Sequence, residues 1–171
     1  AEVLGFPENK LRIIAIDVGG GFGCKIDSYS EPVIAALFAL QLGRPVKWTE
    51  DRQEHFLSTI HGRGEVQYVD AAYKKDGTLL ALRVRYFTDL GAYCIGGSHA
   101  VVDTLTPSGA PGAYKVGSLA WTTCGVYTNK GPVGPYRGYG QHATSYFAER
   151  VMDLIARELD LDPVEVRRRN F

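Results

Sequence analysis

The sequence predicts an α+β fold, in which a mixed sheet with a β-hairpin is covered by packed helices. Two segments of strand-like alternation, 65–73 and 79–89, flank Asp76-Gly77. Because both positions of that dipeptide tolerate positive φ, it is a strong signal for a hairpin turn. Near the end of the chain, 143–161 has the apolar stripe of an amphipathic helix. Strands and helices do not alternate regularly, which favours α+β over a doubly wound sheet.

The first part of the chain predicts a strand, a helix and a second strand. The continuous apolar run at 11–16 is typical of a buried strand. A buried helix is expected over 31–42, because Ser30 offers an N-cap and Gly43 provides a stop. A short strand is expected over 45–50.

The second part predicts the hairpin, a long irregular segment and two helices. In the second hairpin strand the apolar positions alternate, and they are Leu80, Leu82, Val84 and Tyr86. Residues 91–117 are rich in Gly, Pro, Ser and Tyr and predict a long loop. The helical stripe consists of Phe147, Val151, Leu154, Ile155 and Leu159. Asp162 and Pro163 are typical of the start of a short terminal helix.

Composition excludes several classes of protein. The 171 residues suit one domain, and a 45% apolar fraction is enough for a core. Lys plus Arg and Asp plus Glu number 19 each, which argues against a nucleic-acid surface. No transmembrane segment or signal peptide is expected. The three separated cysteines, Cys24, Cys94 and Cys124, form no CxxC pair. They argue against zinc ribbons, iron–sulfur clusters and disulfides, and favour the cytoplasm.

The stretch Asp17 to Lys25, DVGGGFGCK, is the first candidate site. It is no Walker A loop, because Cys24 precedes the lysine and Ile26 follows it. It is no dinucleotide fingerprint either, because the sixth position is a cysteine and the helix starts too late. Glycines without a Cβ let backbone amides approach a ligand closely. The alternative is a plain structural bend.

A second glycine-rich stretch, 131–141, precedes the amphipathic helix, whose N-terminus suits anions. Arg137 in this loop has the geometry to fork onto a phosphate or another anionic oxygen. Tyr139 offers an aromatic ring to a planar substrate. A solvent-exposed arginine in a tight turn is the structural alternative.

Four motifs in this order, DVGGGFGCK, GRPVKWTEDRQEHF, VYTNKGPVGPYRGYG and DLDPVEVRRRNF, resemble the molybdenum hydroxylase family. That family includes xanthine dehydrogenase, aldehyde oxidoreductase and the large subunit of carbon monoxide dehydrogenase. The resemblance implies that Gly20, Gly21, Phe22 and Gly23 contact a molybdenum–molybdopterin cofactor, possibly in its cytosine dinucleotide form. It also implies cofactor binding by Arg137 and substrate binding by Tyr139.

The resemblance further implies an oxidoreductase that hydroxylates an aldehyde or heterocycle with oxygen derived from water. Electrons would pass to iron–sulfur clusters and FAD on partner subunits or domains. In the family the general-base glutamate lies downstream of the matching region. We therefore expect 1–171 to be a single segment of the cofactor-binding domain of a larger subunit, with no catalytic residue of its own and no activity in isolation.

Departures from the family pattern narrow the substrate. Purine-oxidising members carry a glutamate where this chain has Ile26, and an arginine that is absent before Tyr114-Lys115. Carbon monoxide oxidisers carry a cysteine where this chain has Gly138. Two other classes stay open: a different phosphate-binding enzyme, and a non-catalytic scaffold or partner-binding domain of the same fold.

Overall fold

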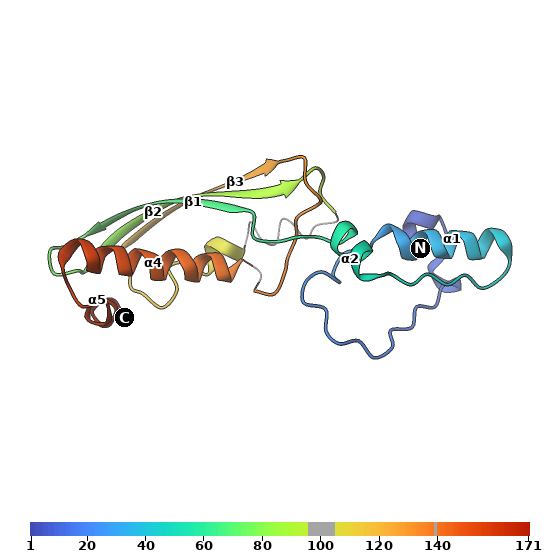
Figure 1. Ribbon diagram of the computed structural model, residues 1–171, viewed down its shortest axis with the longest axis horizontal. Helices are drawn as coiled ribbons and strands as arrows, with labels where there is room; N and C mark the ends of the chain where they lie inside the picture. The colour runs from blue at the N-terminus through green and yellow to red at the C-terminus, as the bar shows by residue number, and fades with distance from the viewer. Residues whose placement is uncertain (96–104, 139) are drawn as a thin grey trace.

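The computed structural model describes residues 1–95, 105–138 and 140–171. The molecule is elongated, with the N-terminal segments at one end and the sheet with the C-terminal helices at the other (Figure 1). The elements are η1 (Glu2–Leu4), η2 (Glu8–Lys10), α1 (Ser30–Leu42), α2 (Arg52–Ser58), β1 (Glu65–Tyr73), β2 (Leu79–Gly91), β3 (Ser118–Tyr127), α4 (Gln141–Leu159) and α5 (Pro163–Asn170). Within these described ranges, no helix is both long and apolar enough to cross a membrane.

The sheet has the order β1-β2-β3 and is mixed, as predicted. β1 and β2 pair antiparallel, while β2 and β3 pair parallel. At the hairpin turn, Gly77 N–H donates to Lys74 O at 2.9 Å, and Gly77 takes a φ of +87°. The Asp-Gly turn is therefore confirmed, whereas β3 was not anticipated because it lies outside the segments with clear alternation.

One apolar position of the hairpin was predicted wrongly. Leu82, Val84 and Tyr86 are buried, but Leu80 is exposed. The register shifts between Ala72 and Tyr73, so that Tyr73 faces Leu79 and Leu80 has no partner in β1. This irregularity reverses the inward alternation at the start of β2, and Leu79 enters the core instead.

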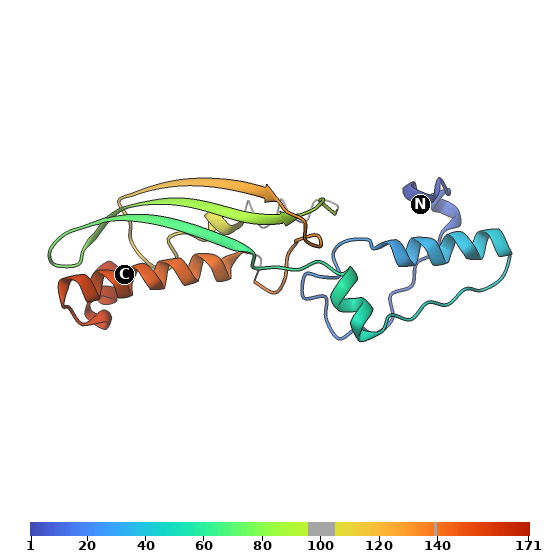
Figure 2. The same ribbon diagram turned by 45° about the horizontal axis from the view of Figure 1, so that its top comes forward.

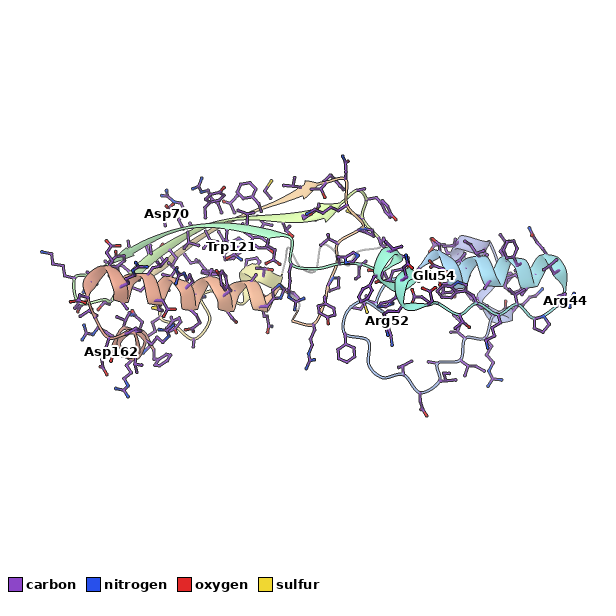
Figure 3. The ribbon with its side chains drawn as sticks, in the orientation of Figure 1. Arg44, Arg52, Glu54, Asp70, Trp121 and Asp162 are labelled. Atoms are coloured by element: carbon purple, nitrogen blue, oxygen red, sulfur yellow. The ribbon has the colours of Figure 1, made fainter. Side chains whose placement is uncertain are left out.

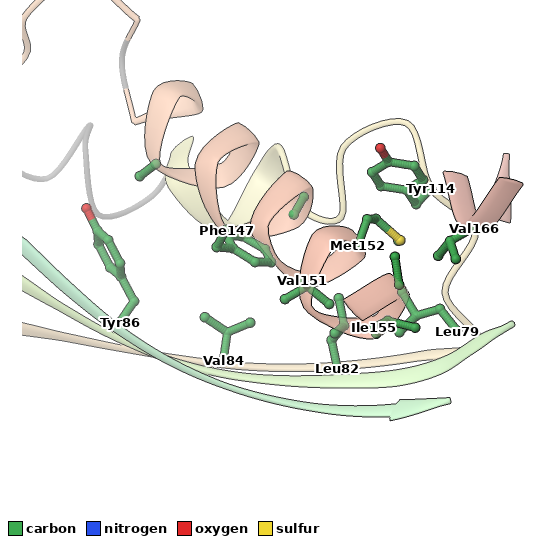
Figure 4. Packing of buried hydrophobic residues seen from close by; sticks show 13 residues of the cluster. Leu79, Leu82, Val84, Tyr86, Tyr114, Phe147, Val151, Met152, Ile155 and Val166 are labelled. Carbon is green, nitrogen blue, oxygen red and sulfur yellow. The ribbon is translucent and has the colours of Figure 1, made fainter. Parts of the chain in front are cut away.

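The core lies between one face of the sheet and α4 (Figures 2 and 4). Phe147, Val151, Met152 and Ile155 of α4 are buried in one cluster with the inward residues of β2. Leu159 packs against this cluster, as predicted. Leu154 was assigned to the same stripe wrongly, since it is 46% exposed. The buried face of α4 is thus narrower than the sequence suggested.

The two strands expected in the N-terminal part are absent. Residues 11–16 and 45–50 have no strand assignment, and Ile13 is 83% exposed. A strand requires a partner for its backbone hydrogen bonds. No described strand pairs with either segment, so apolar composition alone was a misleading signal.

The predicted helix near 31–42 is present as α1, and Gly43 ends it in the left-handed conformation. Its expected burial is wrong, because no residue of α1 is buried. The helix is apolar on nearly every side, yet η1 is its principal contact among the elements (Figure 1).

The C-terminal helix begins as predicted, since the Asp162 carboxylate accepts from Val164 N–H at 2.6 Å. Of the expected long loop over 91–117, residues 105–108 are helical and 96–104 lie outside the described residues. The remaining described positions from 92 to 117 form no strand or long helix.

Candidate functional site

The first glycine loop, 19–24, turns sharply where it meets the second loop. Gly20, Phe22 and Gly23 all have positive φ, at +106°, +52° and +92°. A Cβ on Gly23 would lie 2.2 Å from Pro135 O, so the contact between the loops requires glycine there. The strained φ of Phe22 marks a conformation that the neighbouring contacts must hold.

The same loop presents an uninterrupted run of backbone donors. No described residue accepts a hydrogen bond from the N–H groups of 19–24. A Cβ on Gly19 would meet nothing within 4 Å, and one on Gly21 would meet only Lys25 Cβ at 3.9 Å. These two glycines are therefore not required by packing inside the described chain. They leave bare main chain facing open space.

The second glycine loop is joined directly to the first. Arg137 N–H donates to Phe22 O at 2.8 Å, and the Arg137 guanidinium carbon lies 5.7 Å from the centre of the Phe22 ring. Residues 132–135, which lead into this contact, are buried. Segments more than a hundred residues apart in sequence thus form one local structure.

A cavity of about 580 Å³ opens beside this junction. Its lining includes Gly19, Gly20, Phe22, Lys25, Arg52 and Tyr136. Gly21, Gly23 and Arg137 are not among the lining residues, although their neighbours are. The structure therefore brings the predicted residues together, with Tyr136 rather than Arg137 facing this hollow.

Helix α2 supplies residues that the sequence reasoning missed. Arg52 and His55 line the cavity together with Glu50 and Asp51, and Figure 3 shows Arg52 at the junction between the two ends of the molecule. Asp51 and Glu54 form a complete capping box, each accepting from the other's backbone N–H at 2.8 Å. The D-x-x-E pattern in the sequence was the signal that could have located this helix.

Tyr29 ties the first loop to the chain behind α2. Its hydroxyl donates to Cys24 O and accepts from Ile60 N–H at 3.3 Å. Burial raises the pKa of Tyr29, so the phenol stays protonated and able to donate at neutral pH. Nearby, the His55 ring pairs with Glu50 at 2.8 Å, which orients both side chains at the cavity wall.

The predicted substrate residue Tyr139 lies outside the described residues. Its neighbours Gly138 and Gly140 have φ values of +124° and +81°. A Cβ on Gly140 would approach Thr106 Oγ1 to 2.1 Å, so glycine is required at the start of α4. In the described parts of the chain, no three His, Cys, Asp or Glu side chains gather as a metal site.

The fold and the paired glycine loops define a cofactor-binding domain of the molybdenum hydroxylases. The family model of the molybdopterin cofactor-binding domain matches residues 1–171, and the chain belongs to this family. The resemblance seen in the four motifs is thereby confirmed.

Known relatives share this segment over nearly its whole length. The gamma subunit of the 6-hydroxypseudooxynicotine dehydrogenase complex of Paenarthrobacter nicotinovorans is 38% identical over 100% of this chain and 21% of its own. Reconstituted CO dehydrogenase from Oligotropha carboxidovorans superposes with a TM-score of 0.90, at 32% identity over 99% of this chain and 21% of that one. Quinoline 2-oxidoreductase from Pseudomonas putida 86 has a TM-score of 0.80, at 40% identity over 90% of this chain and 20% of that one. The chain thus spans about a fifth of the relatives it matches.

Proposed function

We propose that residues 1–171 form the cofactor-binding segment of a larger oxidoreductase subunit. The main chain of Gly20, Gly21, Phe22 and Gly23, together with Arg137, would hold a molybdenum–molybdopterin cofactor, in the cytosine dinucleotide form. When bound, this group supplies two-electron oxidation with oxygen derived from water. The observation that carries the proposal is the run of N–H donors over 19–24 at the edge of the cavity, from which no described residue accepts a hydrogen bond.

The described residues fit such a cofactor chemically. Gly19 and Gly21 leave space that a side chain would fill, which allows a ring system to lie against the backbone. Lys25 and Arg52 at the cavity provide cations for a phosphate group. The half-exposed Phe22 ring offers an apolar surface to a flat ring system.

The chain's own part in the reaction is positioning. The carbonyl of Phe22 accepts from Arg137 N–H, while no described residue accepts from the Phe22 N–H, which is thus available to the cofactor. No general base is assigned in this segment, because the family pattern expects that glutamate further along the subunit. We expect the isolated segment to be inactive.

The substrate we propose is a heterocycle or an aldehyde, with Tyr139 facing it. Quinoline, the heterocycle in the name of one structural relative, supports the former. Carbon monoxide is disfavoured as the substrate, because this chain has Gly138 where carbon monoxide oxidisers carry a cysteine. The φ of Gly138 is +124°, and a Cβ there would lie 3.2 Å from His142 Nδ1. A cysteine at this position would be strained.

Partner units complete the proposal. The three thiols are free, and none forms an iron–sulfur motif. We therefore place the 2Fe–2S clusters and the FAD on other subunits or domains, and the assembled enzyme in the cytoplasm.

The test is molybdenum and pterin content of the full-length subunit with Gly21→Ala and Gly21→Val. Packing predicts no loss of stability from Gly21→Ala, and Gly109→Ala, outside both glycine loops, is the matched control because its Cβ would lie an ordinary 3.5 Å from Thr144. We expect the Gly21 variants to lose molybdenum stepwise with side-chain size, while the control keeps it. A wild-type subunit without molybdenum would instead support the scaffold alternative.

A further inference from the structure

Arg63 contacts two consecutive residues of the second glycine loop. One of its terminal nitrogens donates to Arg137 O at 2.9 Å. Its guanidinium carbon lies 4.8 Å from the centre of the Tyr136 ring, within the range of a cation–π contact. Arg63 precedes β1 and is more than seventy residues away from this loop in sequence.

These contacts fix the main chain of Arg137 at both ends. Its N–H donates to Phe22 O at 2.8 Å, while its carbonyl accepts from Arg63. The Arg137 guanidinium is left exposed above the Phe22 ring. Within the described residues, neither Arg63 nor Arg137 forms an ion pair with a carboxylate. Arg63 therefore holds the Arg137 backbone, while no described carboxylate neutralises the Arg137 side chain.

A short backbone pairing places Arg63 opposite the loop. His61 N–H donates to Pro132 O at 3.0 Å, and Gly134 N–H donates to His61 O at 2.9 Å. Gly62 then passes close to Tyr136, where a Cβ would lie 3.2 Å from the Tyr136 Cβ. This register places the Arg63 side chain next to residues 136 and 137, where it makes both contacts.

The backbone of Arg63 is strained. Its φ is +70°, a region in which a residue with a Cβ costs about 1–2 kcal/mol. Glycine would relieve that strain but would remove both contacts to the loop. The strained arginine is thus explained by what its side chain does.

We propose that Arg63 is a positioning residue, which holds Tyr136 and Arg137 in the arrangement that receives the cofactor. This inference rests on the proposed function, since it assigns Arg63 a role in holding the same group. It acts through Arg137 and need not touch the cofactor itself.

The test uses the full-length subunit with Arg63→Gly and Arg63→Lys. Arg63→Gly removes the contacts and the strain together, so the thermal midpoint of the cofactor-free subunit should not fall. Molybdenum retention through dialysis should weaken about tenfold, the lower end of the effect of removing a residue that orients metal ligands. Arg63→Lys keeps a charge and a donor, and should restore part of the retention.

The matched control is Asp160→Gly, which relieves a similar φ of +55° at the end of α4, away from the loops. It should keep full molybdenum. Midpoints are compared without cofactor, because a bound cofactor itself raises them. Full retention in Arg63→Gly, or a loss of molybdenum matched by a lower cofactor-free midpoint, would overturn the inference. Absence of molybdenum from the wild type would contradict the proposed function instead.

Discussion

At the scale of single residues, Asp89 anchors the start of the second glycine loop. Its carboxylate accepts from Gly91 N–H at 2.8 Å and from the Thr128 hydroxyl, and it pairs with Lys130 at 2.8 Å. Burial disfavours the charged form, but Lys130, Thr128 and the Gly91 N–H together outweigh it and lower the pKa of Asp89. The contact between the end of β2 and residues 128–130, which lead into the second glycine loop, thus depends on a charged Asp89.

We predict that Asp89→Asn destabilises the protein by about 2 kcal/mol, because hydrogen bonds to a charged group are lost. Because the pKa of Asp89 is lowered in the folded state, its charge stabilises the fold at pH values above 3.8, the ordinary pKa of the group. This stabilisation is lost as the pH falls through the pKa of the folded state. Urea midpoints between pH 7 and pH 3 should therefore decline less steeply in the variant than in the wild type. Asp70→Asn, on the exposed face of β1, is the control and should show neither effect.

At the scale of elements, the buried side chain of Asn170 connects α5 to the hairpin by hydrogen bonds. The Asn170 side chain accepts from Leu79 N–H at 2.7 Å and donates to Gly77 O at 2.9 Å. Its backbone carbonyl accepts from Lys115 N–H at 2.7 Å. A single asparagine therefore satisfies backbone groups at the turn between β1 and β2, far from it in sequence.

Asn170→Ala should cost on the order of 3 kcal/mol, because a buried N–H and a buried carbonyl lose their partners. Chemical denaturation would measure this cost. Asn9→Ala, in the exposed η2, should change the free energy of unfolding by less than about 0.5 kcal/mol. Equal midpoints for the two variants would contradict the role of Asn170.

The two faces of α4 allow a second element-scale prediction. Met152 is 1% exposed in the core, whereas Leu154 is turned outward. Met152→Ala should destabilise the fold by about 2–5 kcal/mol through the lost contacts and the remaining cavity. Leu154→Ala should stay within about 0.5 kcal/mol of the wild type. If both variants unfold at the same denaturant concentration, the assignment of the buried face is wrong.

At the scale of the whole molecule, large apolar surfaces lie uncovered. They belong to 11–18, to α1 and to the sheet face opposite α4, with Ile13, Phe38 and Tyr68 among them. Soluble proteins rarely expose contiguous apolar patches of this kind without a partner surface. The relatives are about five times longer than this chain, so their additional chain length can supply such a surface.

We predict that hydrogen exchange separates the two ends of the molecule. In the isolated chain, amides of β2 and α4 should be protected, because they enclose the core. Amides of α1 should exchange orders of magnitude faster, since none of its residues is buried. In the full-length subunit α1 should become protected, as mass-spectrometric exchange would show. Equal protection of α1 in both forms would indicate that the additional chain does not cover it.

The sequence by itself determined the elements that depend on local patterns. The turn at Asp76-Gly77, the end of α1 at Gly43, the start of α5 at Asp162 and most of the stripe on α4 follow from φ preferences, capping and helical periodicity. The family, too, was recognisable from the spacing of its motifs.

Only the tertiary structure decided which apolar segments are buried and which distant residues meet. Partners many residues away decide how β3 pairs, why 11–16 is exposed, and where the Arg63 side chain donates its hydrogen bond to Arg137 O. Local propensity carries no information about such partners, because burial and backbone pairing are properties of two surfaces and not of one segment.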